Sequence, residues 1–539
     1  MKKYKFLCKY LRDQRQPLVF IIFGIISTAL MTLPLPYING LIIDLLFARE
    51  NQTRFFYLIT CLLFFHGLKY GIITLSRIKL LKVSAKIVNE IKTDMLNRTV
   101  RFPMSFFMKH EPGYIVSRIN ECNALSDLFS TSTIMSFIGI FDLVFSLFVS
   151  LYLDYRITLI MLLTLPAIVY MSYKSSNAIK KHFKSLMEFS AISNSSLFEI
   201  IHSIEDIKIN NYQKQMIKNA RENLSGFFDS FLKNNKSIVY FTENISAVTK
   251  FSSVILLLLS GLFIYYGELT VGTYVALSQY IMKIIGNVTL FSAVFIQLKP
   301  IEVSITRISE FLNYPIEDQE IKEIPEGKIV KVNFRNVKFS YAPDKQILNN
   351  ISFELLKGKK YRLLGINGVG KSTTLKLISG LYDICEGEIT YNELDYNKID
   401  KIQLRKRVGF VSHTCQLYRG TIIDNIFLSN EKNITRLDEI MSKYQLHSYF
   451  SNLPDGINTI IVQNGSNLSA GQKQLITILR VIAAEYDLLI FDEPISNVDL
   501  NTQEKIIRII GDIQDKIVVI VSHSDKFDGI ENIEIALSS

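Results

Sequence analysis

The run Gly365-Ile366-Asn367-Gly368-Val369-Gly370-Lys371-Ser372-Thr373 decides what the second half of this chain is. Its glycines let the backbone approach a ligand closely, and successive backbone N–H groups at the start of a helix favour an anion. A lysine at the end of such a loop brings its positively charged ammonium group to the terminal phosphates. The hydroxyl of the serine that follows is a ligand for Mg²⁺. The run therefore predicts a P-loop whose residues hold a nucleoside triphosphate.

An acidic pair stands directly after the apolar run Leu488-Leu489-Ile490-Phe491. The run predicts a buried parallel strand, and α/β sheets bind their ligands where such strands end. We therefore expect Asp492 to hold Mg²⁺ through water and Glu493 to polarise the attacking water. His523 follows another strand and is expected to contact the γ-phosphate. An acidic pair alone is commonly a solvated strand end, and a lone histidine is more often structural, so the prediction depends on the elements occurring together.

The string Leu468-Ser469-Ala470-Gly471-Gln472, here called the signature, is far more selective than a P-loop. With the P-loop and the acidic pair it resembles the ATP-binding cassette (ABC) ATPases, in which an LSGGQ-like segment from one cassette caps the nucleotide on the P-loop of another. The resemblance implies ATP and Mg²⁺ as ligands and a chain that works as a dimer. It also implies nucleotide contacts across the dimer from Ser469, Gly471, Gln472 and Asp499.

The resemblance assigns one further residue and exposes three departures. Tyr341 falls where the family stacks an aromatic ring on adenine, although an ordinary strand tyrosine is the alternative. His413 stands where the family has a glutamine that ligates Mg²⁺ and senses the transmembrane half. We therefore predict that His413 is a metal ligand and a catalytic residue, and that ATP hydrolysis is retained but coupled differently to the transmembrane half. The alternative is that Gln416 takes the place of the glutamine. Ala470 replaces the middle glycine, a mild change if the backbone there is helical. Gln463 replaces a glutamate that faces the coupling helices.

Residues 17 to about 300 contain repeated apolar stretches close to the ~20 residues that cross a bilayer. Six spans are predicted, the number expected for half an ABC exporter, and their helices are expected to continue into water. They lie near 17–47, 55–75, 131–153, 156–173, 249–266 and 272–298. The predicted fold is an α-helical six-span transmembrane domain of the ABC exporter type, followed by an α/β P-loop NTPase cassette.

Positive charge orients these spans. The loops at 77–109 and 174–236 are long and rich in Lys and Arg, whereas those near Asp154 and Gly267 are short, and positive loops mark the cytoplasmic side. The basic segment 1–15 follows the same rule, so we predict a multi-pass cell-membrane protein with both termini in the cytoplasm. A secretory signal is the competing interpretation of this start, but no small-residue cleavage pattern follows the apolar run.

The net charge of +10 at pH 7 could also suggest nucleic acid, but the cytoplasmic loop lysines account for much of it. Membrane lipids with anionic headgroups are the expected neighbours, and no nucleic-acid partner is expected. The five cysteines have neither CxxC spacing nor a histidine at zinc-ligand distance, so neither a metal site nor a disulfide framework is indicated.

The resemblance to ABC exporters covers both halves of the chain. Residues 95–107 with 113–119 resemble the first cytoplasmic loop of these exporters, where a short helix docks on a cassette, and 199–208 resemble the second. A charged, proline-punctuated stretch after 314 has the composition of a linker. The predicted organisation is a transmembrane domain at 1–318, a linker at 319–330 and an ATP-binding domain at 331–539.

The ends of the chain carry two expectations. Because the first span begins so close to the start, we expect no amino-terminal peptidase domain. Because few residues follow His523, we expect shortened closing strands and helix in the cassette.

A polar stripe marks the last predicted span. Gln279, Lys283 and Asn287 fall at i, i+4 and i+8 among apolar residues, which places them on one helix face. Such a stripe is predicted to line a substrate cavity, with packing against a polar neighbouring span as the alternative. A polar cavity favours a transported peptide or amphipathic small molecule over a purely lipidic cargo.

The predicted function is ATP-driven export, by alternating access, of a small peptide such as a modified bacteriocin or of a natural product. A lipid or multidrug exporter is the first alternative, and a ligand-sensing regulatory membrane ATPase is the second. The resemblance implies an ATP site shared between two cassettes, and a chain with one membrane half and one cassette cannot complete such a site alone. A homodimer is therefore favoured, with a heterodimer as the alternative.

Overall fold

The computed structural model describes residues 5–48, 52–110, 112–317, 323, 327–342, 345–428, 432–462, 465–528, 530 and 533–537. The chain forms two compact units. The helical unit comprises Met1–Val100 and Glu111–Tyr314, and the cassette unit comprises Arg101–His110 and Pro315–Ser539.

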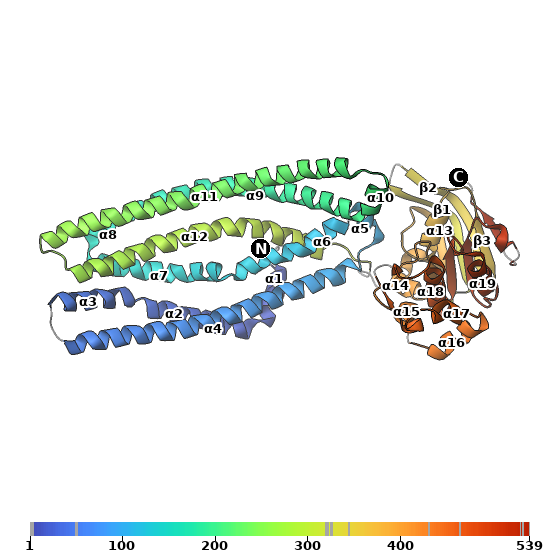
Figure 1. Cartoon of the computed structure of the whole chain (residues 1–539), viewed down its shortest axis with the longest axis horizontal. Helices are drawn as coiled ribbons and strands as arrows, with labels where there is room; N and C mark the ends of the chain where they lie inside the picture. Colours follow the sequence, from blue (N-terminus) through green and yellow to red (C-terminus); the bar gives the residue numbers. More distant parts are fainter. Residues whose placement is uncertain are drawn as a thin grey trace. The chain divides into compact units, whose positions relative to one another are not determined.

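Long helices build the helical unit, and Figure 1 shows them running along one another. Helix α12 packs on α3 and α7, α9 packs on α11, and α2 packs on α4. The helices are α1 (Lys5–Asp13), α2 (Arg15–Thr32), α3 (Leu35–Ala48), α4 (Gln52–Thr99), α6 (Pro112–Asn120), η2 (Glu121–Phe129), α7 (Thr131–Leu153), α8 (Tyr155–Leu162), α9 (Thr164–His202), α10 (Ile204–Ile209), α11 (Gln213–Tyr265) and α12 (Val271–Leu312).

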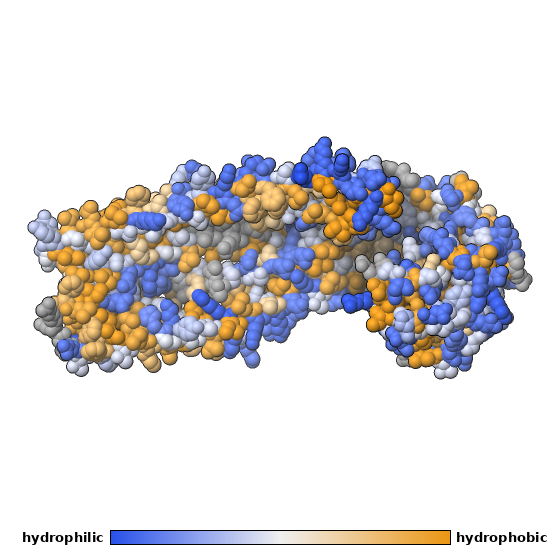
Figure 2. Space-filling view, in the orientation of Figure 1, coloured by the Kyte–Doolittle hydropathy of each residue, from blue (hydrophilic) through white to orange (hydrophobic). Residues whose placement is uncertain are grey.

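Among the described residues, four helical segments are long and apolar enough to cross a membrane, and a shorter apolar helix covers Gly139–Leu153. The four segments are Arg15–Ala48, Gln52–Thr99, Tyr155–His202 and Gln213–Tyr265. The predicted count of six spans stays a prediction. Figure 2 shows apolar side chains gathered on the half of the helical unit that contains α3 and α8, as a lipid-facing surface requires.

Two predicted spans are interrupted. The span at 17–47 is divided between α2 and α3, where neither Pro34 nor Pro36 can donate a backbone hydrogen bond and the carbonyls at the end of α2 need other donors. The span at 156–173 is divided at Leu163, because Pro166 cannot donate to the carbonyl four residues earlier. Helices α4, α9 and α11 extend well beyond the predicted span ends.

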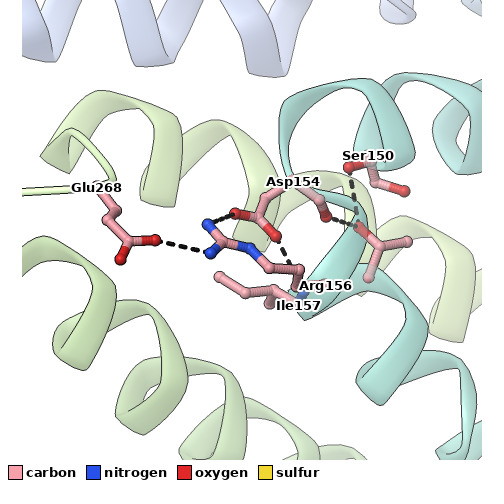
Figure 3. Close-up of polar contacts among 6 residues, drawn as sticks. Ser150, Asp154, Arg156, Ile157 and Glu268 are labelled. Carbon is pink, nitrogen blue, oxygen red and sulfur yellow. Dashed lines mark hydrogen bonds and ion pairs between the residues drawn. The ribbon is translucent and has the colours of Figure 1, made fainter.

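An ion-pair cluster joins two short turns at one end of the helical unit (Figure 3). Asp154 ends α7 and caps α8, where it accepts a hydrogen bond from the Ile157 backbone N–H at 3.0 Å. Arg156 contacts Asp154 at 3.1 Å and Glu268, in the turn before α12, at 2.7 Å. The Arg156 guanidinium also lies 4.1 Å from the centre of the Phe263 ring. The start of α8 is thereby tied to the turn between α11 and α12.

Two main sheets build the cassette unit. The antiparallel sheet has the order β2-β1-β4-β5 and contains β1 (Lys331–Ala342), β2 (Lys345–Leu356), β4 (Glu386–Tyr391) and β5 (Leu394–Asp395). The parallel sheet has the order β11-β3-β10-β9-β6 and contains β3 (Lys360–Leu364), β6 (Val408–Val411), β9 (Leu488–Asp492), β10 (Ile517–Val521) and β11 (Ile533–Ala536). A small sheet pairs β7 (Gly420–Thr421) with β8 (Ile460–Ile461).

The parallel sheet is buried on both faces. Leu488 and Ile490 of β9 pack in one hydrophobic core, while Leu489 and Phe491 pack in the other. A strand covered on both sides must be apolar at every position, which explains the continuous run that the sequence shows. The helices of this unit are α5 (Met104–Lys109), α13 (Lys371–Ile378), α14 (Lys401–Arg405), α15 (Ile422–Phe427), α16 (Ile434–Lys443), α17 (His447–Ser451), α18 (Ala470–Ile482) and α19 (Leu500–Gly511), with η3 (Tyr396–Lys398), η4 (Gly456–Asn458) and η6 (Asp525–Phe527).

Helix α5 belongs to the cassette unit, although about two hundred residues of the helical unit separate it in sequence from the rest of the cassette unit. The Glu317 backbone N–H donates to the Arg101 carbonyl at 2.9 Å, and Phe102 and Phe106 are buried, with their ring centres 4.6 Å apart. A cavity of about 470 Å³ lies beside α5, lined among others by Met104, Met108, Phe339, Tyr341, Tyr382 and Lys401.

Replacing Asp154 with Ala should lower the free energy of unfolding by about 1–2 kcal/mol, because α8 loses its cap and the Arg156 cation loses a buried partner. The midpoint of thermal unfolding in detergent measures this. Glu268→Gln is the matched control and should have a smaller effect, because the Glu268 side chain is half exposed. Equal midpoints for the wild type and Asp154→Ala would show that the cluster is not stabilising.

Candidate functional site

The predicted site residues follow the carboxyl ends of neighbouring parallel strands. The P-loop follows β3, Asp492 ends β9, and His413 and His523 stand just after β6 and β10. Val521 of β10 pairs with Leu363 of β3 on one side and with Asp492 on the other. Because parallel strands end at one edge of their sheet, this register brings segments far apart in sequence to the same edge.

Lys371 begins helix α13, and its side chain folds back over the P-loop. The ammonium donates to the Gly365 carbonyl at 2.6 Å and to the Ile366 carbonyl at 3.4 Å. Gly370 caps the helix with φ of 103°, and a Cβ at this position would lie 2.3 Å from a Leu348 methyl. Only glycine fits there, so the chain can turn sharply into α13 and present the first backbone N–H groups of the helix to an anion.

The two carboxylates at the end of β9 differ in environment. Burial raises the pKa of the Asp492 carboxyl, and the neighbouring charge of Glu493 raises it further. A hydrogen bond from the Ser372 hydroxyl and the charge of His413 act in the opposite direction and lower this pKa. The hydrogen bond places the Ser372 hydroxyl beside Asp492. Glu493 adopts a left-handed backbone conformation with φ of 50°, an uncommon state for a residue other than glycine and one that recurs at functional sites.

Two of the predicted histidines lie near Glu493 or near the loop that follows it. His523 Nε2 is 3.8 Å from the Glu493 carboxylate. His413 Nδ1 lies 3.4 Å from the Ser496 hydroxyl, in the loop after Glu493. Gln416 is exposed, and its backbone carbonyl accepts a hydrogen bond from Arg480 at 3.2 Å. His413 therefore lies next to the loop that follows the acidic pair, and its role as a metal ligand stays a prediction.

These residues fit a magnesium ion bound together with phosphate. Ser372 and Asp492 supply oxygen donors beside one another, and oxygen is the ligand that Mg²⁺ prefers. Within the described ranges, no group of three His, Cys, Asp or Glu side chains could hold a metal ion without other ligands. Such a donor set is incomplete without phosphate oxygens, as is usual for Mg²⁺ in nucleotide sites.

Tyr341 lies at the end of β1, and its ring is fixed by three contacts. Its hydroxyl is 3.1 Å from the Thr373 hydroxyl of α13. The ring meets Phe339 and Tyr382 edge to face, with ring centres 4.8 and 5.3 Å apart. The sequence predicts a role for Tyr341, which stays a prediction, but it does not indicate Tyr382, which the packing of the loop after α13 brings to this ring.

The signature begins helix α18. The Ser469 hydroxyl accepts a hydrogen bond from the Gln472 N–H, and the Gln472 side chain accepts one from the Ser469 N–H, which forms a capping box. Ala470 is helical and has no positive φ, so an alanine costs little here. Gly471 faces Asp499, which caps α19 by accepting from the Thr502 N–H at 3.0 Å. Gln463, the third departure, lies outside the described residues.

The polar stripe on α12 contacts three other helices. Gln279 accepts from Asn39 of α3 at 3.0 Å, and Asn287 donates to Asp142 of α7 at 3.0 Å. Lys283 donates to Asp142 at 3.3 Å and to the carbonyl of Thr32, the last residue of α2, at 2.9 Å. That these residues line a substrate cavity stays a prediction.

Comparison with known families finds two matches. Residues 18–288, about half of the chain, match the family described as the ABC transporter transmembrane region, and residues 348–496 match the family described as ABC transporter.

Comparison with individual proteins finds relatives along most of the chain. The putative ABC transporter ATP-binding protein exp8 of Streptococcus pneumoniae is 29% identical over 89% of this chain and 82% of its own length. The alpha-hemolysin translocation ATP-binding protein HlyB of Proteus vulgaris is 28% identical over 82% of this chain, which spans only 63% of HlyB. A solved structure described as a bacterial Atm1-family ABC exporter with ATP bound has a TM-score of 0.85 at 18% identity, covering 97% of this chain and 93% of that one.

Replacing Tyr341 with Ala should weaken ATP binding about tenfold or more, because stacking of a base on an aromatic ring contributes ~1–3 kcal/mol. Tyr341→Phe keeps the ring and loses only the contact with Thr373, so its affinity should stay close to that of the wild type. Titration with a fluorescent ATP analogue measures both. Equal losses in the two variants would mean that the hydroxyl, not the ring, is what matters.

Proposed function

The chain belongs to the ABC transporter family, and on that premise we propose that it is half of an exporter that moves a small peptide or peptide-like natural product. ATP hydrolysis coupled to transport is the activity of this family, and the helical unit makes the chain a multi-pass membrane protein. The observation that carries the proposal is the convergence of the P-loop, Asp492, Glu493 and His523 at one edge of the parallel sheet.

The proposed roles follow from the positions of these groups. The N–H groups at the start of α13 and the Lys371 ammonium would bind the phosphates of ATP. Ser372 and Asp492 would hold Mg²⁺, which when bound neutralises negative charge on the phosphate oxygens. Glu493 would orient the attacking water and accept its proton, and His523 would contact the γ-phosphate from the end of β10.

The site needs a second cassette under this proposal. Among the described residues, no hydrogen bond or ion pair joins the signature to the P-loop of the same chain. Ser469 and Ala470, at the start of α18, are exposed, which would let them face a nucleotide on a partner. We favour a homodimer with two equivalent sites. Nucleotide-driven closing of two cassettes would switch the helical units between inward-open and outward-open states.

The proposed cargo follows from the polar stripe. Groups of both charge signs lie on α12 and α7 within the apolar part of the helical unit, which suits a cargo with polar groups better than a purely lipidic one. HlyB is named for alpha-hemolysin translocation, which is consistent with a polypeptide cargo here. We place both termini and the cassette in the cytoplasm, on the basis of the positive loops.

Transport into inverted membrane vesicles tests the proposal. Labelled candidate peptides should accumulate inside wild-type vesicles only when ATP and Mg²⁺ are present. Glu493→Gln vesicles are the matched control and should show no accumulation, with ATP turnover reduced about a hundredfold or more, because the water loses its proton acceptor.

Two results would overturn the peptide cargo. Peptides that stimulate ATP hydrolysis but never accumulate would indicate a ligand-sensing ATPase. Accumulation of lipids or hydrophobic dyes alone would indicate a lipid or multidrug exporter.

His413→Gln tests the proposed coupling role of the loop after β6. An amide oxygen suits hard Mg²⁺ better than an imidazole nitrogen does, so the variant should raise turnover with Mg²⁺ relative to turnover with Mn²⁺. Basal and cargo-stimulated hydrolysis are measured with each ion, and Gln416→Ala is the matched control. If His413→Gln leaves both rates unchanged, His413 has no part in coupling.

A further inference from the structure

Three aromatic rings meet beside the helix that begins at the P-loop. Phe339 and Tyr341 stand on β1, and Tyr382 stands in the loop after α13. Their ring centres lie 4.8 Å (Phe339–Tyr341), 5.3 Å (Tyr341–Tyr382) and 5.7 Å (Phe339–Tyr382) apart. The ring planes cross at 89°, 79° and 62° in the same order, so all three pairs meet edge to face, as aromatic pairs prefer. Each ring is therefore held by the other two.

Two backbone contacts fix the chain around Tyr382. After α13, Gly380 has a left-handed φ of 72°, and the Leu381 N–H donates to the Lys376 carbonyl at 3.0 Å, a common way for a helix to end. The Tyr396 hydroxyl donates to the Tyr382 carbonyl, and the Tyr396 side chain is fully buried. Tyr382 is therefore a fixed point against which a neighbouring ring can be aligned.

Helix α13 meets the Tyr341 ring from both of its ends. The Thr373 hydroxyl, in the first turn, lies 3.1 Å from the Tyr341 hydroxyl, and the loop after the last turn carries Tyr382. The same helix begins at Lys371, whose ammonium is proposed to bind the phosphates. One short helix therefore sets the distance between the phosphate end of a nucleotide and the ring that is predicted to stack on its base.

Open space adjoins both Tyr341 and Tyr382. The two side chains line the cavity of about 470 Å³ beside α5. If Tyr382 lost its ring, the Tyr341 ring would be free to turn into this cavity. A ring without a fixed orientation must be ordered when a base stacks on it, and that ordering lowers the affinity for the base.

We propose that Tyr382 is a positioning residue for base recognition. Its ring holds the Tyr341 ring in the orientation on which a nucleotide base stacks, and it acts through Tyr341 rather than through the nucleotide. The inference rests on the proposed function, because it requires an ATP site at the P-loop and a stacking role for Tyr341. Loss of the Tyr382 ring should therefore weaken the binding of ligands that carry a base and leave the binding of ligands without a base unchanged.

The experiment uses the full chain in nanodiscs and two ligands, ATP and ribose 5-triphosphate, which differ only in the base. EDTA replaces Mg²⁺, so that neither ligand is hydrolysed. Displacement of a fluorescent ATP analogue gives both dissociation constants, and the base ratio is the constant for ribose 5-triphosphate divided by the constant for ATP. The wild-type base ratio should be about ten or more, the effect of stacking one base on an aromatic ring.

Replacing Tyr382 with Ala should lower the base ratio about threefold to tenfold, the range that edge-to-face ring contacts contribute. The change should appear in the dissociation constant of ATP alone. Tyr382→Leu fills most of the lost volume without an aromatic edge and should lower the ratio as well, so the test does not depend on the folding of Tyr382→Ala. Tyr382→Phe keeps the ring and should keep the wild-type ratio.

Two further variants separate positioning from other roles. Tyr444→Ala is the matched control, because Tyr444 is a buried tyrosine in the other hydrophobic core of the cassette unit. It should lower the midpoint of thermal unfolding and keep the base ratio. In the double variant Tyr341→Ala with Tyr382→Ala, the base ratio should equal that of Tyr341→Ala, because Tyr382 acts only through the Tyr341 ring.

The outcomes separate this inference from the proposed function. A high wild-type base ratio that survives in Tyr382→Ala and Tyr382→Leu overturns the positioning role and leaves the ATP site intact. A further fall of the ratio when Tyr382→Ala is added to Tyr341→Ala also overturns it, because Tyr382 would then contact the base itself. A wild-type ratio near one contradicts the stacking role of Tyr341 and the inference with it. The peptide cargo is tested by the vesicle assay, whose result does not affect the base ratio.

Discussion

Parallel pairing of β9 with β10 is the constraint on which the nucleotide site depends. The pairing aligns Asp492 with Val521, and the Glu493 N–H donates to the Val521 carbonyl at 2.9 Å, so the backbone hydrogen-bonding continues past the end of the strand. Because β10 also pairs with β3, the same register fixes where the P-loop begins. A shift of one residue would move the acidic pair away from the loop and would turn the buried side chains of β9 toward the wrong core.

A related constraint governs the helical unit, where backbone groups cannot rely on water. The interruption between α2 and α3 frees the carbonyls of Thr32 and Leu33, and α12 supplies donors to both. Lys283 donates to the first at 2.9 Å and Tyr280 to the second at 2.7 Å. The break is therefore satisfied by side chains of a neighbouring helix, as non-helical backbone at membrane depth must be. The polar stripe of α12 thus serves the fold as well as any cargo.

Much of the cassette could be predicted, because its motifs combine residue types with spacing. The apolar run that ends at Phe491 predicts a strand buried on both faces, and β9 is such a strand. Ala470 is expected to be tolerated if the backbone there is helical, and its backbone conformation is helical. The interruptions at Pro34 and Leu163 were missed, since hydropathy averages over a window and hides a single missing N–H donor. The partners of Lys283 were also out of reach, because Asp142 and Thr32 are remote in sequence and meet only through helix packing.

The grouping of α5 with the cassette has a practical consequence for anyone who wishes to study the ATPase alone. A recombinant fragment starting after the last long helix would lack residues 101–110, and with them the buried rings of Phe102 and Phe106 and the partner of the Glu317 backbone N–H. Such a fragment would expose an aggregation-prone apolar surface close to Tyr341, which is one of the residues that line the cavity beside α5. Supplying the missing decapeptide in trans, or grafting it onto the fragment, would return the cover that the intact polypeptide provides.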